Sequence, residues 1–229
     1  MRTQLLIPAA GMGTRLGASQ PKALVNLAGT PLLVHTLRNF QSLDLIRDCL
    51  ITVSASAREA YEKCLAAAFP DHAFELVDGG NERQDSVLNG LAALHRDTEL
   101  VIIHDAARPF APADAIRGSI DAAGEYGAAT VAIPAVDTVL VADESGFLDN
   151  TPDRSLLWAC QTPQTFRVEV IRAAHDAARR AGRMATDDAT LVRLNGGRVK
   201  LVMGSPLNFK ITTPMDMKVA RCVLDGVTE

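Results

Sequence analysis

Two positively charged side chains lie in a glycine-rich segment near the start of the sequence. The apolar run Leu5–Ala10 leads into residues 11–17, which contain three glycines and Arg15, and Lys22 follows shortly after. Glycines let backbone N–H groups approach a phosphate without a Cβ in the way. Transfer at the α-phosphorus of a nucleoside triphosphate needs stabilisation of negative charge, which Arg15 and Lys22 could supply.

The glycine spacing disfavours two common nucleotide-binding classes. A dinucleotide-binding turn has G-x-G-x-x-G and an acidic residue after the second strand. Here the third glycine comes one position late, and the second apolar run ends in Val53 and Ser54. The P-loop pattern G-x-x-x-x-G-K-[ST] is absent. A nicotinamide dehydrogenase remains an alternative, and binding of NADH would support it.

Further polar residues follow the apolar runs that we expect to be strands. These residues are Gly79, Gly80 and Arg83, then Asp105 and Arg108, then Thr162, Gln164, Thr186, Asp187 and Asp188, with Lys210 at the end of the last expected strand. In open α/β sheets, ligands bind beyond the carboxyl ends of the strands. We therefore expect these side chains to meet at one edge of a sheet.

Strands and helices alternate along the chain and would position these residues. The patterns predict strands at 5–10, 49–54, 74–77, 100–104, 128–133, 199–203 and 209–210, and helices at 31–40, 58–68, 85–95, 113–126 and 168–181, after 186 and from 214. Continuous apolar strands separated by helices indicate a sheet covered on both faces. The predicted fold class is α/β, with a single doubly wound, mostly parallel (Rossmann-like) sheet.

The alternation is interrupted between Pro134 and Pro163. Residues 137–142 alternate polar and apolar side chains, residues 143–146 have turn chemistry, and 156–159 form a second extended piece. This pattern predicts a β-hairpin arm, inserted at about 135–160 into a single domain spanning 1–229. An exposed two-stranded arm is marginally stable, so we expect it to pack on a second subunit in a homodimer. An arm folded back on its own domain is the alternative.

The composition bounds the partners and the compartment. The net charge of −4 argues against sequence-independent nucleic-acid binding, which needs a basic face. The cysteines at 49, 64, 160 and 222 are scattered without a CxxC pair, as expected for free thiols in a reducing cytosol. The first apolar run is too short for a signal-peptide core, and no segment reaches membrane-spanning length. We expect a cytoplasmic protein with no membrane contact.

Taken together, the motifs resemble one nucleotidyltransferase family. They are A-A-G-x-G-x-R-L-G with P-K, then Asp78-Gly79-Gly80-x-x-Arg83-x-Asp85-Ser86-Val87, His104-Asp105-Ala106-Ala107-Arg108-Pro109, Asp137-Thr138, Leu157-Trp158, Thr162-Pro163-Gln164, Thr186-Asp187 and Lys210-Ile211-Thr212. In this order, over essentially the whole chain, they resemble the 2-C-methyl-D-erythritol 4-phosphate cytidylyltransferase family of the non-mevalonate isoprenoid pathway. The chain departs from many relatives at Ala23-Leu24 and Asn81, which bears on loop packing and base contact.

The resemblance implies CTP and 2-C-methyl-D-erythritol 4-phosphate as substrates and assigns roles to residues. Arg15, Lys22 and Lys210 would be catalytic; Ala9, Ala10, Gly11, Gly13, Gly80 and Ser86 would bind the nucleotide; Asp105, Arg108, Thr138, Arg154, Thr186 and Lys210 would bind the second substrate, those on the arm across the dimer. Mg²⁺ would be bound through the triphosphate, with Asp105 the candidate to help place it. No general base is needed, because a phosphate monoester is already anionic.

Each side chain also has a structural interpretation. Asp105 could cap a turn, Arg108 could hold its loop against a carboxylate, Thr186 could be a helix N-cap, and Lys210 could protect a sheet edge. The nearest functional alternative is a ribitol-5-phosphate cytidylyltransferase, whose members tend to carry valine where this chain has Ala107. A non-catalytic nucleotide-binding regulator is a further alternative, and the presence of both Arg15 and Lys22 speaks against it.

Overall fold

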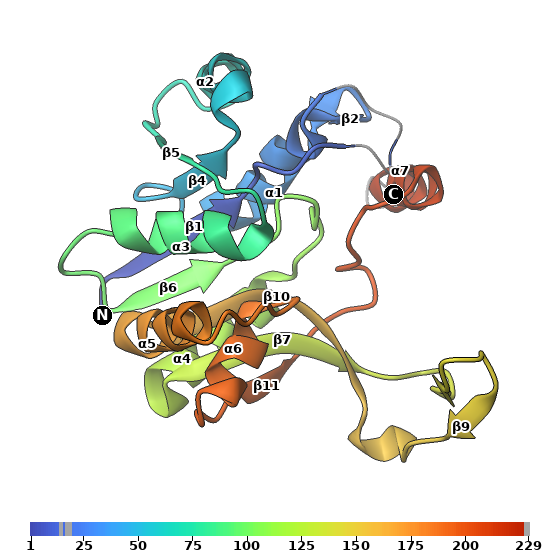
Figure 1. Ribbon diagram of the computed structural model, residues 1–229. Helices are drawn as coiled ribbons and strands as arrows, with labels where there is room; N and C mark the ends of the chain where they lie inside the picture. Colours follow the sequence, from blue (N-terminus) through green and yellow to red (C-terminus); the bar gives the residue numbers. More distant parts are fainter. Residues whose placement is uncertain (14–15, 17–19, 227–229) are drawn as a thin grey trace.

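A seven-stranded sheet forms the centre of the protein. The computed structural model describes residues 1–13, 16 and 20–226, and the strand order is β11-β7-β10-β6-β1-β4-β5 (Figure 1). The strands are β1 (Thr3–Pro8), β4 (Leu50–Val53), β5 (Glu75–Asp78), β6 (Leu100–Ile103), β7 (Ala128–Pro134), β10 (Trp158–Arg167) and β11 (Lys200–Met203). Only β10 runs antiparallel to its neighbours in this sheet. The predicted doubly wound, mostly parallel α/β fold is confirmed.

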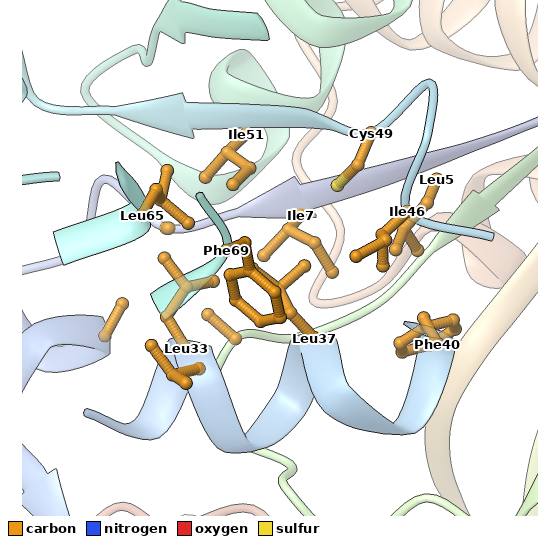
Figure 2. Close-up of a cluster of buried hydrophobic side chains, with 14 of the residues drawn as sticks. Leu5, Ile7, Leu33, Leu37, Phe40, Ile46, Cys49, Ile51, Leu65 and Phe69 are labelled. Carbon is orange, nitrogen blue, oxygen red and sulfur yellow. The ribbon is translucent and has the colours of Figure 1, made fainter. Parts of the chain in front are cut away.

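Helices cover both faces of the sheet because its central strands are apolar on both sides. On β1, Leu5 and Ile7 face the cluster packed by α1 (Leu32–Gln41), α2 (Arg58–Ala68) and the Ile116 side of α4 (Ala113–Tyr126) (Figure 2). Leu6 faces the opposite cluster, which is packed by α3 (Arg83–Ala93), α5 (Val168–Arg180) and α6 (Asp188–Leu194). This alternation is the period-two pattern of a strand buried on both faces. Among the described residues, no helix has the length and apolar character to cross a membrane.

The start of α3 differs from the sequence prediction in a way that matters for the pocket. The helix begins at Arg83 rather than at residue 85, and it ends at Ala93. A reciprocal capping box explains the earlier start: the Glu82 side chain accepts from the N–H of Asp85, and the Asp85 carboxylate accepts from the N–H of Glu82. Arg83 is therefore fixed in the first turn of the helix.

The predicted strand at residues 209–210 is wrong. Lys210 lies in a loop between β11 and α7 (Pro214–Gly226). The next residue, Ile211, donates its N–H to the Ala107 carbonyl at 2.9 Å, which ties this loop to the one after β6. Phe209 and Ile211 belong to a small apolar cluster that joins α7 to the short strand β2 (Asn26–Leu27), which pairs with β3 (Thr30–Pro31).

The arm is a smaller hairpin than the sequence predicts. It contains β8 (Val141–Ala142) and β9 (Leu148–Asn150), and its turn is closed by the Asp143 carboxylate, which accepts from the N–H groups of Ser145 and Phe147. The extended piece predicted at 156–159 does not pair with 137–142. It divides between a short 3₁₀ helix at Arg154–Leu156 and the start of β10, where Trp158 pairs with Pro134 in the main sheet. Figure 1 shows the arm projecting from the body.

Candidate active site

A pocket of about 360 Å³ lies beyond the carboxyl ends of β1, β5 and β6. Its wall comes from five separate parts of the sequence: Pro8, Ala9, Ala10, Gly11, Met12, Lys22, Ala23, Gly80, Asn81, Glu82, Arg83, Ser86, Asp105, Ala106, Ala107 and Lys210. Most of the residues expected at the site are thus brought together. This is the position at which open α/β sheets bind their ligands.

One wall of the pocket is built mainly from backbone and small side chains, and we call it the backbone wall (residues 9–11, 79–80 and 86). Gly80 donates its N–H to the Ser86 hydroxyl at 3.0 Å, and that hydroxyl donates to the Glu82 carbonyl at 3.1 Å. A Cβ on Gly79 would lie 2.5 Å from the Ala10 Cβ and 3.0 Å from the Ser86 Oγ. The two loops therefore approach so closely that only glycine fits at position 79.

Lys22 also lines the pocket, next to the backbone wall. It opens a short 3₁₀ helix, Lys22–Leu24, and its backbone N–H donates to the Gly11 carbonyl at 3.1 Å. The Met12–Pro21 bridge closes the base of the same segment. Gly13 is buried and is not among the residues that line the pocket. Arg15, predicted to be catalytic, lies outside the described residues.

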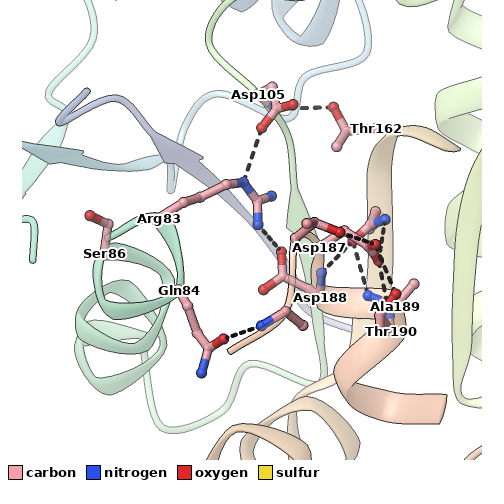
Figure 3. A network of polar contacts seen from close by, with 12 residues as sticks. Arg83, Gln84, Ser86, Asp105, Thr162, Asp187, Asp188, Ala189 and Thr190 are labelled. Carbon is pink, nitrogen blue, oxygen red and sulfur yellow. Dashed lines mark hydrogen bonds and ion pairs between the residues drawn. The ribbon is translucent and has the colours of Figure 1, made fainter. Parts of the chain in front are cut away.

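Another part of the pocket carries Arg83, Asp105 and Lys210, which form one charged cluster with Arg108 and Asp188 behind them; we call these five side chains the charged wall. Arg83 bridges two carboxylates, with Nε 3.2 Å from Asp105 Oδ1 and Nη1 2.8 Å from Asp188 Oδ2 (Figure 3). The other oxygen of Asp105 accepts from Lys210 Nζ at 2.9 Å and lies 3.5 Å from Arg108 Nε. These are three cations against two carboxylates, so one positive charge remains for an anionic ligand.

The two carboxylates of this wall and the guanidinium of Arg83 keep their charges at neutral pH. Burial by itself raises the pKa of the Asp105 carboxyl. Three nearby cations outweigh that effect and hold the pKa well below its ordinary value: Arg83, Lys210 and Arg108. Burial likewise opposes ionisation of Asp188, but Arg83 lowers its pKa. Burial by itself lowers the pKa of Arg83. The two carboxylates outweigh that effect and raise the pKa above its ordinary value, so the guanidinium stays charged.

Asp188 is held from behind by a buried histidine. His175 and Asp188 are each 1% exposed, and His175 Nε2 lies 3.1 Å from Asp188 Oδ1. A residue of β10 also positions Asp188: the Gln164 side-chain oxygen accepts a hydrogen bond from the N–H of Asp188 at 3.0 Å. The charged wall is thus anchored in α5, α6 and the sheet.

Arg108 does not line the pocket and supports the charged wall from behind. Its Nη1 donates to the Asn208 carbonyl at 2.8 Å and its Nη2 to the Cys160 carbonyl at 3.4 Å, while Nε faces Asp105. Its side chain is 12% exposed. The structure therefore gives Arg108 the loop-holding contacts of its structural interpretation.

Three of the expected substrate-binding residues are not brought to the pocket. Thr138 and Arg154 are exposed on the arm, and Arg154 donates to the Val136 carbonyl at 2.8 Å. Thr186 is exposed at the start of the segment that leads into α6. The N-cap of α6 is its neighbour Asp187, whose carboxylate accepts from the N–H of Thr190 at 2.9 Å.

The sequence analysis placed Arg83 and Asp188 at the expected edge of the sheet but gave neither a role in the site. Both lie inside motifs that the sequence displays, Asp78–Val87 and Thr186–Asp188. Their spacing of 105 residues hides the ion pair that joins them. One observation in the sequence could have indicated such a pair. An arginine that follows a glycine-rich turn beside a predicted pocket needs a carboxylate partner if it is buried.

The described residues form no cluster of three or more His, Cys, Asp or Glu side chains that could bind a metal ion. Asp105 lines the pocket, but its two carboxylate oxygens already face cations, one Arg83 and the other Lys210. Mg²⁺ commonly uses one or two carboxylates together with substrate phosphates. The donors present therefore fit a Mg²⁺ carried mainly by phosphate oxygens rather than by the protein alone.

Comparisons with known proteins identify the family. The family model described as 2-C-methyl-D-erythritol 4-phosphate cytidylyltransferase matches residues 3–226. The chain belongs to this family. It is 42% identical to the 2-C-methyl-D-erythritol 4-phosphate cytidylyltransferase of Caldanaerobacter subterraneus, over 98% of this chain and 99% of that protein. It is 44% identical to that of Syntrophotalea carbinolica, over 98% and 97%.

Solved structures of the cytidylyltransferase family have the same fold. The 4-diphosphocytidyl-2C-methyl-D-erythritol synthase of Anaerococcus prevotii superposes with a TM-score of 0.86 at 29% identity, covering 98% of both chains. The 2-C-methyl-D-erythritol 4-phosphate cytidylyltransferase of Thermus thermophilus gives 0.80 at 33% identity, covering 98% of this chain and 100% of that one. The protein is a cytidylyltransferase by family, and its pocket lies where this fold would bind a nucleotide.

Proposed function

We propose that the protein transfers CMP from CTP to 2-C-methyl-D-erythritol 4-phosphate, giving 4-diphosphocytidyl-2-C-methyl-D-erythritol and pyrophosphate, in isoprenoid precursor synthesis by the non-mevalonate route. The observation that carries this proposal is the family match over residues 3–226. The relatives described above all bear the methylerythritol name, which favours this activity over transfer to ribitol 5-phosphate.

The backbone wall suits the base and the charged side chains suit the phosphates. In the proposed reaction Ala9, Ala10, Gly11, Gly80 and Ser86 contact cytosine. Lys22, with Arg15, stabilises the α-phosphate while the bond to pyrophosphate breaks. Lys210 and Asp105 hold the second substrate near that phosphorus. An oxygen of the phosphate monoester forms the new P–O bond, and pyrophosphate leaves with the electron pair of the broken one.

Positioning provides most of the catalysis in this scheme. The attacking phosphate oxygen is already negative, so no side chain has to remove a proton. The excess positive charge of the charged wall draws the two anionic substrates together, and the pocket holds them for in-line attack. Mg²⁺ would be carried by the triphosphate and would neutralise charge on the phosphate oxygens; Asp105 would help to place it through an oxygen that otherwise faces Arg83 or Lys210.

Homodimer formation through the arm belongs to the proposal. The arm exposes several large apolar side chains: Val136, Leu140, Phe147, Leu148 and Leu156. Apolar surface of this kind is typical of a protein interface. A partner arm would bring Thr138 and Arg154 to a pocket that they do not reach within one chain. Phe147→Asp should give a monomer in sedimentation, whereas Tyr126→Asp, which changes another exposed aromatic, at the end of α4, should leave a dimer; a dimeric Phe147→Asp variant contradicts this part of the proposal.

We also propose a cytoplasmic location. Its support is that all four cysteines are free thiols in the structure, although Cys160 and Cys222 are exposed. Free exposed thiols are typical of a reducing compartment.

The decisive experiment is pyrophosphate release from CTP with Mg²⁺. Release should require 2-C-methyl-D-erythritol 4-phosphate and should be much slower with ribitol 5-phosphate at the same concentration. Omission of Mg²⁺, with a chelator present, should abolish it. Preference for ribitol 5-phosphate, or no release with either polyol phosphate, overturns the proposed substrate.

A further inference from the structure

A buried tyrosine reaches the backbone wall from behind. Tyr61 lies on α2 with no exposed surface, and it is not among the residues that line the pocket. Its hydroxyl donates a 2.6 Å hydrogen bond to the Ala9 carbonyl oxygen. The Ala9 N–H donates to the Thr52 carbonyl at 2.8 Å. Both backbone polar groups of Ala9 are therefore bound by the protein.

This bond determines the direction of the next amide. The Ala9–Ala10 peptide is trans, so its C=O and N–H point in opposite directions. The C=O points at Tyr61, in the apolar cluster between β1 and α2. The Ala10 N–H must then point away from that cluster, and Ala10 lines the pocket. Of the hydrogen bonds between described residues outside helices and strands, none uses this amide.

We propose that Tyr61 is a positioning residue for base binding: its hydroxyl orients the Ala9–Ala10 peptide so that the Ala10 amide donates to an acceptor on the cytosine of CTP. The inference rests on the proposed function for the identity of the ligand. The hydroxyl remains a donor throughout the working pH range, because burial raises the pKa of Tyr61.

Packing alone does not require the hydroxyl. The Tyr61 ring is among the largest fully buried side chains, and a phenylalanine ring would fill the same space. Without the hydroxyl, however, the Ala9 carbonyl loses its partner and the peptide is free to tilt. Tyr61→Phe therefore separates orientation of the amide from packing of the core.

The test compares Tyr61→Phe with wild type. We expect the KM for CTP to rise about tenfold, as for loss of one well-placed hydrogen bond. The kcat and the KM for 2-C-methyl-D-erythritol 4-phosphate should stay within about twofold, since neither depends on the base contact. Calorimetric titration of the protein with CTP alone should show the same weakening.

Ser119→Ala is the matched control. Ser119 is fully buried in α4 and does not line the pocket; its hydroxyl donates to the Ile116 carbonyl at 2.8 Å and lies 2.8 Å from the Thr165 hydroxyl. Ser119→Ala removes a buried hydroxyl, as Tyr61→Phe does, so urea unfolding of the two variants should show comparable losses of stability. The KM for CTP should not change.

The outcomes separate this inference from the proposed function. An unchanged KM for CTP in folded Tyr61→Phe, or equal changes in Ser119→Ala, overturns the role of Tyr61. Wild-type protein that binds CTP but releases no pyrophosphate with the polyol phosphate overturns the function and leaves the test of Tyr61 by calorimetry intact. If Tyr61→Phe does not fold, the Ala10 amide resonance of wild type decides: it must shift on CTP addition, and a constant resonance overturns the inference.

Discussion

The backbone wall and the charged wall of the pocket are built on opposite principles. The backbone wall uses peptide groups and closely packed small residues, as at Gly79 and Ala10. The charged wall uses long side chains whose positions depend on one another, with Arg83 held between Asp105 and Asp188. The first wall can fail through the addition of a single methyl group. The second can fail through loss of a single charge.

The difference separates two kinds of recognition. Peptide groups do not titrate in the physiological range, so the backbone wall should read shape and hydrogen-bonding pattern at any working pH. The charged wall attracts anions but needs each buried charge to be compensated. Substitutions in the two walls should therefore have different signatures in stability, rate and pH dependence.

The largest expected effect comes from breaking the charged wall at its centre. Arg83→Met removes the guanidinium and leaves the buried Asp188 without its arginine partner, which should cost about 3–5 kcal/mol of unfolding free energy. Urea denaturation measures this loss. Arg2→Met is the control, because Arg2 also bridges two carboxylates, Asp97 and Asp48, but at the surface; it should cost under about 1 kcal/mol. Equal losses would mean that burial does not distinguish the two arginines.

The next effect should appear in catalysis rather than in stability. Lys210→Ala removes the ammonium 2.9 Å from Asp105 and should lower kcat/KM about 10²–10³-fold, as for loss of one charge that stabilises the transition state. Initial rates of pyrophosphate release measure the change. Lys200→Ala, which removes an ammonium lying 5.5 Å from the Tyr126 ring, should keep the wild-type rate. A fully active Lys210→Ala would show that the charged wall serves folding alone.

A smaller effect should follow pH, through His104. Burial lowers the pKa of His104 to about 4, against about 6.5 for an exposed histidine. The unfolded chain then takes up a proton as pH falls below about 6.5 while the folded chain does not, so stability declines toward pH 4. Between pH 7 and 5 this residue should account for about 2 kcal/mol of unfolding free energy.

A non-titrating variant tests that contribution. His104→Gln should lose stability less steeply between pH 7 and 5, even though its stability at pH 7 is lower because the bonds to Thr162 and to the Arg108 carbonyl are weakened. Denaturation at several pH values gives the two slopes. Parallel slopes would assign the decline to other groups.

The smallest expected effect is steric and falls on the backbone wall. Gly79→Ala places a Cβ against Ala10, and the required shift should raise the KM for CTP about tenfold while the pH profile of kcat stays that of wild type. Steady-state kinetics over a range of pH measures both. Among the described residues, no atom beyond its chain neighbours lies within 4 Å of a Cβ placed on Gly11. Gly11→Ala should therefore keep the structure, and any loss there would come from contact with the ligand itself.

The backbone wall was largely predictable from sequence, because its residues occur in short motifs. Ala9 to Gly11 follow a strand directly, and Gly80 and Ser86 lie six residues apart in one turn and helix start. Local chemistry of this kind follows from glycine placement and capping. The roles given to these residues and to Lys22 stay predictions until the kinetics are measured.

The charged wall and the arm were less predictable, since both depend on contacts between distant segments. Nothing near Arg83 in the sequence indicates that Asp188 is its partner. The alternation at 137–142 was typical of a strand, yet only Val141 and Ala142 pair in the hairpin. Phe209 and Lys210 resemble an edge strand in sequence. Their backbone instead forms a loop that is hydrogen-bonded, through the N–H of Ile211, to the loop after β6.

The long separations within the charged wall bear on how the chain reaches its native state. The Arg83–Asp188 pair closes a loop of 105 residues, and the bond from Arg108 to the Asn208 carbonyl closes one of 100. Closing such loops is entropically costly and is repaid only after the intervening sheet has formed. We therefore expect the charged wall to be completed late in folding, after the strands that lie between its members in the sequence have paired.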